Sequence, residues 1–396
     1  MISVAEALER IFALVPQMPA ETVPLAEAGG RVLARDAVAR RDQPPFPASA
    51  MDGYAVRAAE ATADARLAIA GEAAAGHAHP HPLPEGAAIR IFTGAPVPEG
   101  ADAILIQENA AREGETLTVT EAPAPGAHVR PAGGDFRAGD RIAAPRRLTA
   151  RDVALIASMN IAEVVVARRP EVAVIPTGDE LVLPGGDPGP DQIVASNNFG
   201  LAALLSAIGA RPRLCPIARD SRESLVAALE AAEGADILVT IGGASVGDHD
   251  LVAQVFGAEG LALDFHKVAM RPGKPLMTGR IGAALMIGLP GNPVSALVCG
   301  EIFLRPAVEA ALGLPAVPRR RGPARLAHAI EANGPREHYM RARSEADGSV
   351  SLCASQDSSL LATLARADAL VVRAPHAPAL PAGAEVEVIR LDGTDA

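Results

Sequence analysis

The sequence predicts a multidomain α/β fold, and three observations support this class. Its 396 residues are too many for one ordinary core, so two to four domains are expected. Residues 170–316 repeat strand, polar loop and helix, a pattern typical of a parallel sheet covered by helices. Residues 48–137 and the last 80 residues contain short apolar runs between Gly and Pro, which predicts β-rich modules.

The individual elements follow from hydrophobic spacing and capping residues. A helix is expected at 3–15, where Ser3 and Glu6 form a possible capping box, and another after Thr149, capped through Asp152. The alternating region predicts strands at 171–175, 236–241 and 284–289 and helices at about 198–208, 222–232 and 293–311. The proline cluster at 43–47 and the stretch 315–321 indicate a domain boundary and a linker.

The composition disfavours several classes of protein. A net charge of −11 and 3% aromatic residues without Trp disfavour a nucleic-acid binder, which needs a basic field and stacking platforms. No apolar run reaches the roughly 20 residues that span a bilayer, and no signal peptide is visible. Cys215, Cys299 and Cys353 form neither a disulfide framework nor a zinc motif, so a cytoplasmic protein is expected. An anionic substrate would need a local cationic pocket.

Two loops follow buried strands of the predicted parallel sheet, at the edge where such sheets bind ligands. The first contains Thr177, Gly178, Asp179 and Glu180, although an ordinary turn with solvated acids is an equal alternative. In the second, closely spaced glycines let the backbone approach a phosphate and present several N–H groups to it. Its residues are Gly242, Gly243, Ser245, Gly247, Asp248 and Asp250, and the two aspartates suit a bridging Mg²⁺.

A third loop, Pro290-Gly291-Asn292-Pro293, precedes the helix that contains Ser295. Asn292 is a favoured N-cap and Pro293 suits the first turn, so a positive helix end would face out of the sheet. Between the second and third loops, the strip from Lys267 through Arg271 to Lys274 supplies three cations in an acidic chain. We interpret this strip as a cationic pocket, although a solvated face is the common alternative.

The ordered set of motifs resembles the molybdopterin molybdenumtransferase family, the bacterial relatives of gephyrin's C-terminal half. The motifs appear in the family's order over about residues 1–315, and the set is far more specific than any single motif. They are Pro44-Pro45-Phe46, Met51-Asp52-Gly53-Tyr54-Ala55, Thr93-Gly94-Ala95, Pro176 to Leu181, Gly242 to Gly247, Pro272-Gly273-Lys274-Pro275 and Gly288 to Ser295.

The resemblance implies four domains in an elongated homodimer. Residues 1–42 and 138–169 would form a discontinuous helical and extended N-terminal domain, with a β-rich domain, 43–137, inserted in it. An α/β molybdopterin-binding domain would cover 170–316, and a C-terminal β-barrel-like module would cover 317–396. The family's reaction inserts molybdate into adenylylated molybdopterin and releases AMP, with Mg²⁺ as the cofactor and no nucleic acid or membrane as a partner.

Site residues carry over from the family position by position. The resemblance makes Glu180, Asp220 and Asp250 the carboxylates tied to metal and catalysis, although Asp220 could instead cap the helix that follows it. Asp52 and Thr93 would come from the partner subunit, with Asp135 as a weaker candidate. The cationic strip would hold molybdate or the pterin phosphate; Arg271 stands where the family commonly has Lys, which preserves the charge.

Three other functions compete with this interpretation. Gly243-Ala244-Ser245-Val246-Gly247 also matches the nucleophile motif of α/β-hydrolases, but Asp264 and His266 lack the usual spacing for the remaining catalytic residues. A non-catalytic, gephyrin-like scaffold is a second alternative. A molybdopterin adenylyltransferase is the third, and the 170 additional N-terminal residues argue against it.

Overall fold

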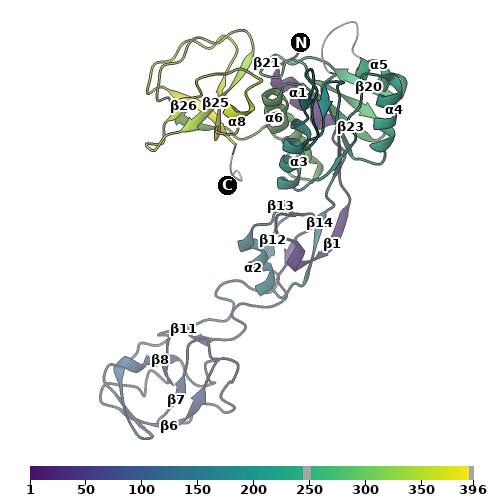
Figure 1. The fold of residues 1–396 in the computed structure, drawn as a ribbon. Coiled ribbons are helices and arrows are strands. Elements are labelled where there is room, and N and C mark those ends of the chain that lie inside the picture. The colour runs from purple at the N-terminus through teal and green to yellow at the C-terminus, as the bar shows by residue number, and fades with distance from the viewer. Residues whose placement is uncertain (244–250, 392–396) are drawn as a thin grey trace.

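The computed structural model describes residues 1–243 and 251–391. Figure 1 shows an extended molecule: the α/β domain and the C-terminal β module lie at one end, the inserted β domain lies at the other, and a small sheet with helix α2 lies between them. In the part of the chain that is described, no helix is long and apolar enough to cross a membrane.

The central sheet has six strands in the order β18-β15-β19-β23-β22-β20. The first four are parallel, β22 runs antiparallel to them, and β20, antiparallel to β22, runs in their direction again; the sheet is therefore largely parallel, as expected from the sequence. Their bounds are β15 Glu171–Pro176, β18 Arg211–Leu214, β19 Ile237–Ile241, β20 Leu261–Phe265, β22 Met277–Ile281 and β23 Ala284–Leu289. The strands β15, β19 and β23 are buried almost throughout, as expected for a sheet covered on both faces.

Helices cover both faces of this sheet. One apolar core contains α3 (Asn197–Ala207), α6 (Pro293–Cys299) and α7 (Arg305–Ala311), and the other contains α4 (Arg222–Ala231) and α5 (Leu251–Ala258). The first helix, α1 (Val4–Leu14), is capped by Ser3, whose side chain accepts a hydrogen bond from the Glu6 N–H. Its apolar face packs into the core of the α/β domain, so its packing differs from the expected grouping with residues 1–42.

The long helix expected at 293–311 is interrupted. A π-helical turn, Gly300–Leu304, separates α6 from α7, and the Arg305 N–H bonds to the Gly300 carbonyl. Pro306 lacks an N–H and cannot donate to the carbonyl four residues before it. The extra residue in the turn is thus a local adjustment to proline, which the hydrophobic spacing alone did not predict.

A four-stranded sheet is built from both sides of the inserted segment, in the order β1-β14-β2-β13. Beside it lies α2 (Ala150–Ser158), where Thr149 and Asp152 form the predicted capping box. The strands of this region are β1 Ala20–Pro24, β2 Val32–Leu33, β13 Arg146–Arg147 and β14 Glu163–Ala167, with a separate pair of β3 Ala37–Val38 and β12 Arg141–Ile142.

The inserted region and the C-terminal region are β-rich, as predicted. The inserted sheet runs β8-β5-β7-β6-β10-β9, and the C-terminal sheet runs β21-β25-β27-β28-β24 with β26 beside β25. The inserted strands are β4 Ala48–Ser49, β5 Gly53–Val56, β6 Arg66–Ala73, β7 Ala87–Ile91, β8 Ala103–Ile106, β9 Ala110–Glu113, β10 Thr116–Val119 and β11 Val129–Arg130. The C-terminal elements are β24 Gly322–Arg325, β25 Glu337–Ser344, β26 Val350–Leu352, α8 Leu361–Leu364, β27 Ala369–Arg373 and β28 Glu385–Arg390, while β21 Met270–Arg271 comes from the preceding region. The exact domain bounds stay a prediction.

Candidate functional site

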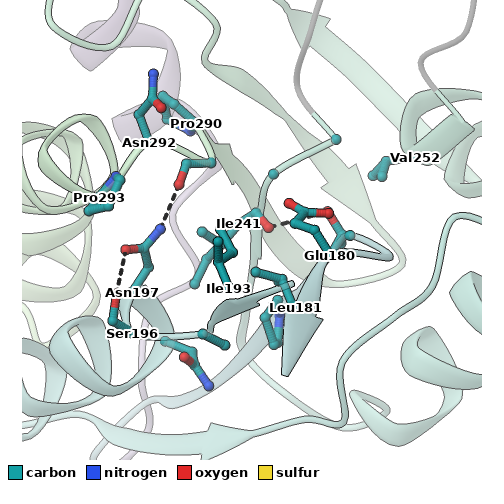
Figure 2. Close-up of a pocket in the computed structure, with 18 of the residues that line it drawn as sticks. Glu180, Leu181, Ile193, Ser196, Asn197, Ile241, Val252, Pro290, Asn292 and Pro293 are labelled. Carbon is teal, nitrogen blue, oxygen red and sulfur yellow. Dashed lines mark hydrogen bonds between the residues drawn. The ribbon is translucent and has the colours of Figure 1, made fainter. Parts of the chain in front are cut away.

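A cavity of about 1090 Å³ opens at the carboxyl ends of β15, β19 and β23. The three loops singled out in the sequence meet there, which is the place where an open parallel sheet binds ligands. Residues from these loops that line the cavity are Thr177, Gly178, Glu180, Gly242, Gly243, Pro290, Gly291 and Asn292. Figure 2 shows Glu180 on one side of this space and Asn197, Pro290 and Asn292 on the other.

Glu180 lies in a tightly constrained turn. Gly178 has a φ of +141°, which side-chain-bearing residues rarely adopt, and the Glu180 carboxylate lies over it, with Oε2 2.3 Å from where a Cβ would be. The Glu180 carbonyl accepts a hydrogen bond from the Ile193 N–H at 2.8 Å, which joins β16 (Leu181–Val182) to β17 (Ile193–Val194). The sequence did not predict this short parallel pair, whose second strand lines the cavity.

Asp220 also lines the cavity, on the loop that follows β18. The alternative that it caps α4 is wrong: Ser221 is the N-cap, and its side chain accepts a hydrogen bond from the Ser224 N–H. Partial burial and the negative charges of Asp179 and Glu180 raise the pKa of the Asp220 carboxyl. The carboxylates of Asp179, Glu180 and Asp220 therefore lie near one another, and the charges of the first two act on the third.

The glycines let the three loops approach one another. A Cβ on Gly242 would lie 2.7 Å from the Thr177 carbonyl oxygen, and one on Gly243 would lie 2.3 Å from the Val252 side chain. A Cβ on Gly291 would lie 3.6 Å from the Gly242 Cα. Thr177 is buried and donates from its hydroxyl to the Ile241 carbonyl at 3.2 Å. The loops thus form one packed surface rather than three independent turns.

The third loop is stabilised by contacts that local sequence did not predict. Asn292 occupies the N-cap position of α6, but its side chain makes no cap; its Nδ2 donates to Ser358 Oγ at 3.3 Å instead. The Val294 N–H donates to the Ser358 carbonyl at 3.1 Å, and the neighbouring Ser359 lines the cavity. From α3, Asn197 Nδ2 donates to the Gly291 carbonyl at 2.7 Å (Figure 2). The C-terminal module therefore contributes to the cavity wall.

Known families account for nearly the whole chain, in order. Residues 2–160 match the MoeA N-terminal region, residues 173–310 match a probable molybdopterin binding domain, and residues 323–391 match the MoeA C-terminal region. A molybdopterin molybdenumtransferase of Synechococcus elongatus is 33% identical over 97% of this chain and 96% of its own length. The chain belongs to the molybdopterin molybdenumtransferase family.

Other relatives agree with this family. The molybdopterin molybdenumtransferase of a Nostoc strain is 38% identical over 79% of this chain and 75% of its own length. Among solved structures, a molybdopterin biosynthesis MoeA protein from Pyrococcus horikoshii matches the whole of both chains with a TM-score of 0.85 and 31% identity. The likeness therefore covers the arrangement of the full chain as well as the α/β domain.

Two of the site residues inferred from the family lie in the inserted domain. Asp52 Oδ1 accepts hydrogen bonds from both the N–H and the hydroxyl of Thr93, each at 2.8 Å, and these bonds lower the pKa of the Asp52 carboxyl. Figure 1 shows β7, which ends just before Thr93, at the opposite end of the molecule from the α/β domain. Within one chain, the Asp52–Thr93 pair and the cavity are separate.

The cationic strip of the family also lies apart from the cavity lining. Lys267, Arg271 and Lys274 are not among the described lining residues, whereas the adjacent Pro275 is. The strip turns toward the C-terminal sheet because β21, which contains Arg271, pairs with β25. Burial, followed by the charges of Arg271, Arg336 and Arg341, lowers the pKa of His338 to about 4. Arg271 therefore lies with Arg336 and Arg341 near His338, where the strip meets the C-terminal sheet.

Several residues singled out from the sequence do not line the cavity or lie outside the described residues. Ser295 is 4% exposed within α6 and does not line the cavity. Ser245, Gly247 and Asp250 lie outside the described residues. Asp264, invoked for the hydrolase alternative, is 3.8 Å from Arg10 in an ion pair. Conversely, Asn197, Asn198 and Ser359 line the cavity although no local motif in the sequence identifies them.

Proposed function

We propose that this chain inserts molybdate into adenylylated molybdopterin and releases AMP, as a cytoplasmic homodimer. The observation that carries the proposal is the cavity at the carboxyl ends of the parallel strands, where glycine loops and two acidic side chains meet. The glycines allow a phosphorylated ligand to approach the backbone closely. The family's relatives, which carry the name molybdopterin molybdenumtransferase, support this reaction over other uses of such a cavity.

Glu180 and Asp220 suit Mg²⁺, because carboxylate oxygens are the donors that this ion prefers. The raised pKa of Asp220 supports a cation there, since a positive charge would offset the repulsion among the carboxylates. No group of three or more potential metal ligands exists among the described residues, and the third expected ligand, Asp250, lies outside them. When bound, Mg²⁺ would neutralise phosphate charge and polarise a phosphoryl oxygen.

The chain's own groups would divide the remaining work. Glu180 would orient the water that attacks the adenylyl phosphorus and breaks its bond to the molybdopterin phosphate, because its carboxylate lies over Gly178 in the cavity wall. The cations of the strip, Lys267, Arg271 and Lys274, would attract molybdate to the edge of the cavity, which the adjacent Pro275 lines. The Asp52–Thr93 pair of a second copy would complete the site, since the pair lies far from the cavity within one chain (Figure 1).

A reconstitution assay tests this function. Purified protein is mixed with adenylylated molybdopterin, Mg²⁺ and molybdate, and both AMP and active molybdenum cofactor are measured. We expect both products, and omission of molybdate should abolish the active cofactor. A pure scaffold would release no AMP, and an adenylyltransferase would instead require a nucleoside triphosphate and molybdopterin. Either of those results would overturn the proposal.

A further inference from the structure

The turn that carries Glu180 has an unusual set of hydrogen-bond partners. The Glu180 carbonyl accepts from the Ile193 N–H, while the carbonyls of Gly178, Asp179 and Leu181 are all within hydrogen-bond distance of one nitrogen, Arg219 Nη1. The three distances are 3.3, 2.8 and 3.0 Å, respectively. The carbonyls of four consecutive residues are therefore all bonded, three of them to a single side chain.

Arg219 is itself held by its surroundings. The main-chain N–H of Arg219 donates to Ser224 Oγ at 2.8 Å, and Ser224 lies in the first turn of α4. The next residue joins the two loops directly, because the Asp220 N–H donates to Asp179 Oδ1 at 3.0 Å. The Gly178 N–H donates to the Ala218 carbonyl at 3.0 Å. The first loop is thus fastened along its length to the segment that starts α4.

This fastening acts on Glu180 through the main chain. The carboxylate is folded over Gly178, so a shift of the carbonyls at 178 and 179 would move the support on which it lies. In addition, no ion pair between Arg219 and Asp179, Glu180 or Asp220 occurs among residues 1–243 and 251–391. The guanidinium is bonded to main-chain carbonyls instead.

We propose that Arg219 is a positioning residue that fixes the 178–181 main chain and thereby holds Glu180 in the cavity. This inference rests on the proposed function only in that a catalytic role is assigned to Glu180. Arg219 is not among the residues that line the cavity, so it acts through the loop rather than on the substrate. A direct role in binding the anionic substrate is the competing explanation, and it predicts different kinetics: a raised KM without a change in the loop.

The experiment compares three variants of the full-length protein. Arg219→Met keeps the apolar stem and removes the donors, whereas Arg219→Lys keeps charge and donors but loses the planar fork. Arg222→Met is the matched control, because Arg222 lies three residues later, is 57% exposed and pairs with Glu259 away from the loop. Hydrogen exchange of peptides covering 177–182 and 193–195 is measured without substrate, and kcat, KM and Tm are measured separately.

We expect Arg219→Met to speed exchange in those two segments only and to lower kcat about 10- to 100-fold, with little change in KM or Tm. Arg219→Lys should fall between that variant and wild type, and the control should match wild type. Unchanged exchange at 177–182, or a rise in KM at unchanged kcat, would overturn the proposal, as would faster exchange throughout the α/β domain. Because hydrogen exchange is measured without substrate, it tests the positioning role of Arg219 even if the protein does not catalyse the proposed reaction.

Discussion

At the scale of single residues, the site brings Asp220 close to two other acids, Asp179 and Glu180. Glu180 could be selected from the sequence because it follows a buried strand end, where parallel sheets bind ligands. Asp220 was ambiguous, since an aspartate before a helix is a normal cap. Only the structure resolves this, because Ser221 takes the cap and Asp220 faces Asp179 and Glu180 instead.

This arrangement predicts that Asp220 supports activity at the expense of the stability of the fold. Its pKa is raised in the folded protein, so folding favours the protonated form and the ionised form at neutral pH destabilises the fold. Asp220→Asn should therefore raise the Tm at pH 7 in Mg²⁺-free buffer while lowering activity. The gain should disappear as the pH falls below the ordinary value of 3.8, because wild-type Asp220 is then neutral in both states. Thermal unfolding from pH 3 to 8 measures this.

Added Mg²⁺ provides the control for that prediction. It should raise the Tm of wild type more than that of Asp220→Asn, because the variant lacks one ligand and one charge. A lower Tm for Asp220→Asn than for wild type at pH 7 without Mg²⁺ would contradict the explanation that burial and the charges of Asp179 and Glu180 disfavour ionised Asp220.

At the scale of elements, the sequence predicts the three loops of the cavity but not the tertiary contacts that hold them. Strand ends and glycine spacing locate the three loops in sequence, because both are local patterns. The contacts that hold them are tertiary: Asn292 bonds to Ser358, which is 66 residues away, rather than to its own helix. For the same reason the sequence could not show that β21 turns the cationic strip toward the C-terminal sheet.

The close approach of the loops predicts a steric effect at Gly242. A Cβ there would meet the Thr177 carbonyl at 2.7 Å, at a φ of +94°. Gly242→Ala should therefore lower the free energy of unfolding by about 1–3 kcal/mol more than a glycine substitution that meets no neighbour. Gly282→Ala is the matched control, since Gly282 also has a positive φ, +56°, but nothing lies within 4 Å of its Cβ position. Denaturant unfolding compares the two, and equal losses would contradict the packing of the loops.

At the scale of the molecule, the extended shape separates two sets of functional residues. The sequence motifs place Asp52 and Thr93 in one β-rich segment and the acids in another, but only the fold shows how far apart these segments lie (Figure 1). The Asp52–Thr93 hydrogen bonds show that the two motifs form one unit. A complete site in this account therefore requires two copies of the chain.

Mixed dimers test that requirement. Asp52→Asn and Glu180→Gln chains should each be inactive alone. The mixture is informative if each site combines Asp52 of one copy with Glu180 of the other. In a mixed dimer, one site carries both substitutions and the other carries neither. A statistical mixture should thus recover activity in about a quarter of the sites, measured as AMP release. No recovery in a mixture that demonstrably exchanges subunits would contradict a shared site.

The central claim is that the cavity beside Glu180 releases AMP, and single-turnover AMP release from adenylylated molybdopterin tests it most directly. Glu180→Gln preserves the size of the side chain, and Glu163→Gln, at an exposed position on β14, is the matched control. The account predicts that the control matches wild type and that Glu180→Gln slows AMP release about 100-fold or more without lowering the Tm. AMP release at the wild-type rate from Glu180→Gln would contradict it.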